Sequence, residues 1–225
     1  MIEYITDMAQ PDGSLPLIGS GIPSSGLSSG GYSLWENSYP RLAYIRSGGL
    51  DGNPEVENRS HAYIANYPIS GHIALRSSWD TNPDDISHVM VDAGPFRTSH
   101  SQLDHFTMTW FKENPILVDP GLFSYEKGAE RDYFEGTRAH NVVVIDGKDQ
   151  TKSYSILSTD TYFSESSVGV VSSIEIQGNV WTRAIILIDN ETLVIMDDVK
   201  GETSRSHVQT WHFDDKLDII SSNNE

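Results

Sequence analysis

Residues 94–150 read GPFRTSHSQLDHFTMTWFKENPILVDPGLFSYEKGAERDYFEGTRAHNVVVIDGKDQ. This stretch holds three of the eight histidines of the chain, His100, His105 and His140, and a carboxylate, Asp119, that ends an apolar run. Imidazole and carboxylate groups can exchange protons or bind ligands near neutral pH. We therefore expect any chemistry of the protein to lie here.

Every second residue from 100 to 110 belongs to a set that begins polar and ends apolar: His100, Gln102, Asp104, Phe106, Met108 and Trp110. Alternate side chains of an extended strand share one face. The pattern predicts a strand over 104–111, with polar groups at one end leading into a core at the other. His105 is expected on the opposite face.

Two further strands are predicted close by. Residues 116–119 end at Asp119 before a Pro-Gly turn, and residues 141–146 follow His140 directly and end at an Asp-Gly turn. The ends of these strands can bring His100, Gln102, Asp119 and His140 together. The simpler interpretations are that Asp119 only caps its turn and that His140 only bonds across strands.

The remaining pattern favours an all-β fold, a large antiparallel β-sandwich of two stacked sheets. Short apolar runs separated by turn residues predict strands at 71–77, 87–92, 104–111, 116–119, 141–146, 167–176, 180–188, 192–199 and 206–213. Residues 11–60 hold nine of the 18 glycines and five of the 10 prolines, so we expect an irregular linker with at most a short helix at 41–47.

Composition excludes several classes of protein. The 225 residues carry a formal net charge of −17, which disfavours nucleic acid as a partner. No stretch of about 20 apolar residues predicts a membrane span. The absence of cysteine excludes disulfides and thiolate metal sites, and the N-terminal residues lack the basic and apolar regions of a signal peptide.

Long motifs give the chain a family resemblance. They are SH-x-x-x-D (Ser99, His100, Asp104), PILVDPGLFSY (115–125), RDYFEGTRAHNVVVIDGKDQ (131–150), PDGSLPLIG (11–19) and GHIALRSSWD (71–80). With these the chain resembles the C-terminal β-sandwich of the heparinase II/III-like polysaccharide lyases, which cleave uronic-acid polymers by β-elimination. The resemblance implies a linker and toroid remnant over 1–65 and a β-sandwich domain over 66–225. Because residues 219–225, IISSNNE, show no closing strand, we expect this domain to be truncated at its C-terminus. A periplasmic or secreted location is implied as well.

The resemblance also implies roles for individual residues. The family pattern H-x-H-x-x-D makes His100 the catalytic candidate, and makes Asp119 and His140 metal ligands. Its second histidine, the third metal ligand, is Gln102 here. Since zinc prefers nitrogen and sulfur donors, three interpretations stay open: zinc with water as a ligand, a harder ion such as calcium or manganese, or a hydrogen-bonded network without metal.

Substrate binding is the role expected of Arg138, Arg131 and Tyr125, because guanidinium groups form forked hydrogen bonds with carboxylates. The two arginines alternatively form surface ion pairs with Glu135 or Asp132, which contribute little. The resemblance places a catalytic tyrosine and a carboxylate-gripping Asn-His pair in the preceding helical toroid, a partner domain outside this chain. We expect this part alone to be inactive.

Charge argues against a strongly anionic substrate. The window 97–140 has five Lys or Arg against seven Asp or Glu, which gives −2 and leaves −15 for the remainder. Either the toroid supplies a positive wall or the glycan is sparsely charged. The function expected is that of the β-sandwich portion of a lyase acting on an acidic polysaccharide. The alternative is a noncatalytic carbohydrate-binding or scaffolding sandwich that has lost this activity, an idea motivated by Gln102.

Overall fold

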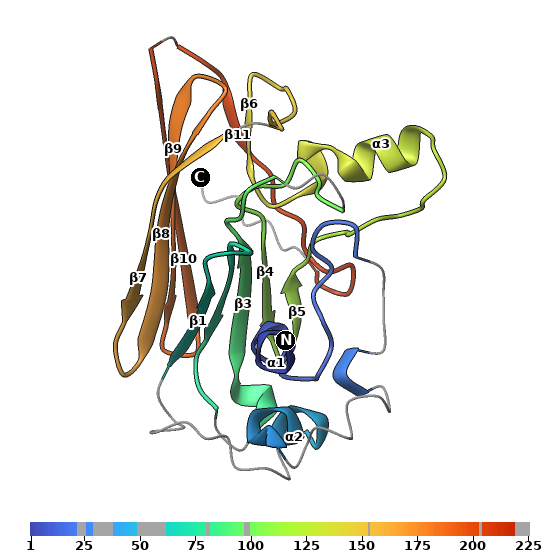
Figure 1. The fold of residues 1–225 in the computed structure, drawn as a ribbon, viewed down its shortest axis with the longest axis vertical. Coiled ribbons are helices and arrows are strands. Elements are labelled where there is room, and N and C mark those ends of the chain that lie inside the picture. Colours follow the sequence, from blue (N-terminus) through green and yellow to red (C-terminus); the bar gives the residue numbers. More distant parts are fainter. Residues whose placement is uncertain are drawn as a thin grey trace.

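The computed structural model describes residues 1–21, 26–28, 38–48, 62–79, 82–96, 100–152, 154–202 and 204–218. Two antiparallel sheets form its body (Figure 1). The first has the order β1-β2-β3-β4-β5, with strands Tyr63–Tyr67, His72–Arg76, Ser87–Asp92, Met108–Lys112 and Asn114–Leu117. Each strand lies beside its neighbour in the sequence, so this sheet is a simple meander.

The second sheet faces the first in Figure 1 and has the order β10-β9-β8-β7. Its strands are β7 (Ser155–Phe163), β8 (Ser167–Ile176), β9 (Asn179–Ile188) and β10 (Thr192–Gly201). A two-stranded sheet pairs β6 (Val143–Ile145) with β11 (His207–Gln209). The prediction of an antiparallel β-sandwich is confirmed.

The core lies between the two large sheets. Alternate residues of β9, among them Trp181, Ile185 and Leu187, are buried and meet Val89 and Met108 of the first sheet in one apolar cluster. The buried ring of Phe106 lies edge-on to that of Trp181, with ring centroids 4.9 Å apart. Burial of the apolar faces is the main stabilising contribution to this packing.

Helices lie outside the sandwich. The α-helices are α1 (Ile2–Met8), α2 (Pro40–Arg46) and α3 (Ala129–Glu135), and single turns of 3-10 helix occur at η1 (Gly26–Ser28), η3 (Pro83–Asp85) and η4 (Thr137–Ala139). Asp7 of α1 ties two of them to the first sheet, since it accepts hydrogen bonds from Arg41 at 2.8 Å and Tyr67 at 2.6 Å. Within the described residues, no helix is long and apolar enough to span a membrane.

Most predicted strands are present, with small shifts at their ends. The bounds of β3 and β8 match the prediction, and the helix predicted at 41–47 is α2. Strands β1 and β7 and helices α1 and α3 were not predicted. The boundary expected after residue 65 stays a prediction, and β1 spans it.

The strand predicted over 104–111 is wrong in its first half. Strand β4 begins only at Met108, and Phe106 has a positive φ of 70°. The side chain of Gln150 binds the backbone of His105, which donates its N–H at 3.0 Å and accepts through its carbonyl at 3.1 Å. Because Thr107 N–H also turns back to the Asp104 carbonyl at 2.7 Å, this segment forms a turn and the alternation of faces is lost.

One buried cation ties the second sheet to the segments that precede β4 and β6. Arg183 of β9 is 1% exposed and donates from Nη1 to the carbonyls of Phe106 at 2.8 Å and Asn141 at 2.6 Å. Its Nε and Nη2 contact the Asp197 carboxylate at 2.7 Å each. Burial would raise the pKa of Asp197, but the hydrogen bonds and charge of Arg183 outweigh it and lower that pKa below 3.8.

The substitution Asp197→Ala should therefore lower the free energy of unfolding by about 3–5 kcal/mol, because it leaves the buried Arg183 charge unpaired. Equilibrium denaturation in urea measures this loss. Asp198→Ala is the matched control: Asp198 pairs with Lys200 at the surface, so its loss should change the stability by less than about 1 kcal/mol. Equal effects of the two substitutions would contradict the account.

The same pair predicts a pH dependence. A carboxylate whose pKa is lowered on folding contributes stability above its unfolded pKa, near 3.8, and this is lost as the pH falls through the folded pKa. We expect the stability difference between the native protein and Asp197→Asn to be largest above pH of about 4 and to shrink in stronger acid. A difference that grows on acidification would contradict the assignment.

Candidate active site

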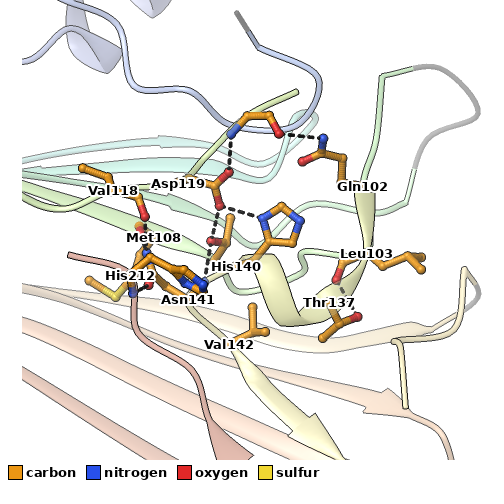
Figure 2. Close-up of polar contacts among 12 residues, drawn as sticks. Gln102, Leu103, Met108, Val118, Asp119, Thr137, His140, Asn141, Val142 and His212 are labelled. Atoms are coloured by element: carbon orange, nitrogen blue, oxygen red, sulfur yellow. Dashed lines mark hydrogen bonds and ion pairs between the residues drawn. The ribbon is translucent and has the colours of Figure 1, made fainter. Parts of the chain in front are cut away.

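The centre of the candidate site is a buried pair. Asp119 follows β5 and His140 follows η4, and His140 Nδ1 lies 2.9 Å from Asp119 Oδ2 (Figure 2). Both side chains are fully shielded from solvent. Burial alone would lower the pKa of His140, but the charge and hydrogen bond of Asp119, with the charge of Asp104, raise it overall.

Two more donors satisfy the Asp119 carboxylate. Thr107 Oγ1 donates to Oδ2 at 2.7 Å, and the Gly121 N–H donates to Oδ1 at 3.2 Å. Asp119 thus caps its own turn and also bonds across the fold. Its carboxylate therefore accepts hydrogen bonds both within its own turn and from two other segments of the chain.

Gln102 lies next to this network and binds the backbone. Its Nε2 donates to the Gly121 carbonyl at 3.1 Å (Figure 2), and the side chain is almost completely buried. Its Oε1 and the Nε2 of His140 are buried without a hydrogen-bond partner among the described residues. The amide therefore holds the turn after Asp119 in place.

His100 lies apart from the buried pair, at the surface. Its backbone has a positive φ of 61°, and its carbonyl accepts the Ser20 N–H at 3.1 Å. A side chain at Gly19 would place its Cβ 2.7 Å from the same carbonyl oxygen, so the segment approaches this closely only because residue 19 is glycine. The N-terminal segment thereby fixes the position of His100.

A cleft of about 270 Å³ opens beside His100. Its walls also include His72, Asp92, Ser101 and Asp104, together with the backbone of residues 18–21. His72 Nε2 lies 3.5 Å from Asp92 Oδ2. Imidazole and carboxyl groups therefore converge on one hollow that can admit a ligand.

Asp104 connects the cleft to the buried pair. Burial, reinforced by the charge of Asp92, raises the pKa of Asp104 to about 7, and the charge of His140 opposes the rise. Its Oδ2 has no hydrogen-bond partner among the described residues. A carboxyl group with this pKa can donate or accept a proton near neutral pH.

The expected metal ligands do not fit zinc in this arrangement. Both oxygens of Asp119 already accept hydrogen bonds, one of them from His140 Nδ1, and Gln102 supplies an amide where zinc prefers nitrogen or sulfur. Calcium takes about six to eight oxygen ligands, and Asp119 and Gln102 offer few. Across the part of the chain that the structure describes, no three His, Cys, Asp or Glu side chains gather as a metal site.

The expected substrate-binding residues divide between two places. Arg131 donates to the Tyr125 carbonyl at 2.7 Å and pairs with Glu135 at 2.8 Å, and the ring of Tyr125 lies 6.5 Å from that of His100. Arg138 instead lines a hollow with Tyr133 and other residues of 132–149. The sequence neighbours Arg138 and His140 are therefore separated, since only His140 points into the buried network.

Several residues of the site were not singled out from the sequence. Asn141 donates to the carbonyls of Met108 and Val118 at 2.8 Å each and accepts the His212 N–H at 2.7 Å, which joins β4 to the segments that follow β5 and β11. Its place directly after His140 was the only signal. The ring of His105 hydrogen-bonds to the Gly94 carbonyl at 2.9 Å, and Ser99 lies outside the described residues.

The chain is similar to known lyases in sequence and in fold. A heparin-sulfate lyase of Bacteroides stercoris is 27% identical over 185 residues, which cover 78% of this chain and 26% of that protein. A heparinase III gene product superposes over 99% of this chain and 35% of its own, with a TM-score of 0.82 and 21% identity. A mutant heparan sulfate lyase of Pedobacter heparinus does so over 95% and 34%, with a TM-score of 0.81 and 17% identity.

The chain corresponds to only a part of each of these proteins. The chain spans about a quarter of the length of the curated relative and about a third of the two solved chains. The likeness to the solved structures establishes the fold. The model of the heparinase II/III-like C-terminal region matches residues 60–225, and the chain therefore belongs to the heparinase II/III-like family.

Proposed function

We propose that this chain is the β-sandwich portion of a polysaccharide lyase that cleaves a uronic-acid-containing glycan by β-elimination. The observation that carries the proposal is His100, an exposed residue that lines a cleft together with His72, Asp92 and Asp104. The names of its relatives, heparin-sulfate and heparan sulfate lyases, support the same reaction class. Because the chain spans only part of those proteins, the activity belongs to the intact protein.

The reaction needs a base, an acid and a partner that neutralises the substrate carboxylate. The base removes the C5 proton beside the carboxylate, the C4–O bond breaks as the C4=C5 double bond forms, and the acid gives a proton to the departing oxygen. The substrate carboxylate must also be neutralised, since the developing enolate adds negative charge. In this proposal His100 is the catalytic residue, as the base when neutral or as the carboxylate partner when protonated.

In this proposal, the buried network holds His100 in position and does not itself react. Asp119 and His140 are sealed from solvent, so they cannot touch a polysaccharide. They hold the turn at Gly121 to which Gln102 is bonded, two residues from His100. Asp104, with its raised pKa and its place in the cleft wall, is suited to share a proton with the substrate.

Substrate contacts beyond the cleft complete the proposal. The ring of Tyr125 lies 6.5 Å from that of His100, Arg131 bonds to the Tyr125 carbonyl, and Arg138 with Tyr133 lines a separate hollow of about 420 Å³. Guanidinium groups here can grip carboxylate or sulfate groups of the glycan. The helical toroid preceding this region is the proposed partner domain that supplies the remaining catalytic groups.

We further propose that Asp119, His140 and Gln102 form a hydrogen-bonded support rather than a zinc site. The bonds already made by Asp119 and the amide at position 102 support this proposal. No step of the mechanism depends on a metal.

His100→Ala in the intact protein should reduce kcat/KM by at least about a hundredfold, because a general base contributes that much. The ultraviolet absorbance of the unsaturated uronate product, formed from a panel of acidic polysaccharides, measures the rate. His207→Ala, at an exposed histidine of β11, is the control and should be unaffected. Full activity of His100→Ala would refute its role, and saturable binding without product by the wild-type protein would favour a noncatalytic sugar-binding module.

Elemental analysis of the purified protein should find zinc well below one equivalent, and a chelator should leave the melting temperature unchanged. Gln102→His is the matched comparison: it supplies the imidazole expected of a family zinc site, so its zinc content should rise. Zinc near one equivalent in the wild-type protein would contradict the hydrogen-bonded support.

A further inference from the structure

Three aromatic side chains of the segment from residue 123 to α3 are largely exposed to solvent. Phe123 is 63% exposed, Tyr125 56% and Tyr133 51%. The first two lie in the segment after Asp119, and Tyr133 lies on α3. Large apolar surfaces gathered in this way mark binding sites more often than chance, because each exposed ring gains free energy when it is covered.

Phe134 gathers these rings into a cluster. The ring of Phe123 stacks on that of Phe134 at 5.5 Å with planes 14° apart, and Tyr133 meets Phe134 edge-on at 5.3 Å. Tyr125 extends the cluster toward His100, since those two rings lie 6.5 Å apart. We call Phe123, Tyr125, Tyr133 and Phe134 the aromatic platform.

The platform is held in place without being buried. None of the residues of α3 is buried, yet Arg131 on this helix bonds to the Tyr125 carbonyl at 2.7 Å and so ties α3 to the loop. At the start of the loop, the Leu122 N–H donates to the Gly21 carbonyl at 2.9 Å. A surface held in this way loses little entropy when a ligand binds.

The surroundings of the rings identify the kind of occupant. Charged residues are interleaved with the aromatic ones on α3, whose sequence is AERDYFE, whereas the buried centres of protein–protein interfaces are depleted of charge. A pyranose ring offers an apolar C–H face to an aromatic ring and hydroxyl groups to a charged rim. The ring of Tyr125 lies 6.5 Å from that of His100, which lines the cleft where the proposed reaction takes place.

We propose that the aromatic platform is a sugar-stacking subsite, which receives pyranose units of the glycan next to the bond that is cleaved at His100. This inference rests on the proposed function. It also answers the objection from charge, because stacking on aromatic rings holds a sugar without requiring a net positive surface on a chain of net charge −17.

The test measures binding apart from catalysis. The probe is a heparan sulfate octasaccharide, titrated calorimetrically into the intact protein carrying His100→Ala so that no turnover occurs. Adding Phe123→Ala or Tyr133→Ala should raise Kd about two- to tenfold each. Phe123→Leu should weaken binding like Phe123→Ala, since it keeps an apolar group but removes the ring, and Tyr133→Phe should bind like the parent.

Matched controls lie on the edge strand of the other sheet. Tyr162 and Phe163 of β7 are 57% and 58% exposed, so Tyr162→Ala and Phe163→Ala remove rings of equal exposure away from the cleft and should leave Kd unchanged. In the catalytically intact background, the platform substitutions should raise KM more than they lower kcat. This pattern distinguishes a binding subsite from a structural role.

Two results would overturn the subsite: a Kd unaffected by Phe123→Ala and Tyr133→Ala, or no saturable binding by the parent. An unchanged Kd together with a melting temperature lowered by several degrees would show that the rings pack against another part of the polypeptide. If the wild-type protein forms no unsaturated product but the platform substitutions still weaken binding, the proposed reaction fails and the subsite stands.

Discussion

The carboxylate of Asp119 is the constraint on which the site depends. A buried charge is costly unless donors surround it, and three segments of the chain must meet here to provide them. Thr107 comes from the turn before β4, Gly121 from the turn after β5, and His140 from the end of η4. Once these bonds form, the strand ends can adopt only one arrangement relative to one another.

In the proposed mechanism, this arrangement separates the supporting residues from the reacting one. The imidazole of His140 is buried, whereas His100 lines the cleft. The backbone of His100 has a positive φ, and its carbonyl accepts a hydrogen bond from the Ser20 N–H. Gln102 and Asp119 both bond to the backbone of Gly121. The loop that bears Phe123 begins at this turn. A single buried network therefore places both the catalytic candidate and the surface that can carry sugar rings beside it.

Strong alternation made much of the sandwich predictable. The bounds of β3 and β8 follow from apolar runs bounded by turns, whereas β7, an exposed edge strand of mostly polar residues, gave no such signal. The alternating set at 100–110 misled because the side chain of Gln150, distant in sequence, replaces strand pairing at His105. Tertiary hydrogen bonds of this kind are invisible to local periodicity.

The site was predictable to a similar degree. Asp119 and His140 stand at strand ends, so their pairing follows from the order of the elements. Residue types alone could not reveal that Gln102 bonds to a backbone carbonyl, nor that Phe123 would remain exposed. Both depend on how the turn after β5 is oriented, which only the assembled fold determines.

The most direct measurement is a crystal structure of the intact His100→Ala protein with an uncleaved uronate-containing oligosaccharide. The account predicts that the C5 hydrogen of one uronate points at the space vacated by the imidazole of His100 and that a neighbouring sugar ring lies on Phe123 or Tyr133. An oligosaccharide bound elsewhere, with this cleft filled only by solvent, would contradict it.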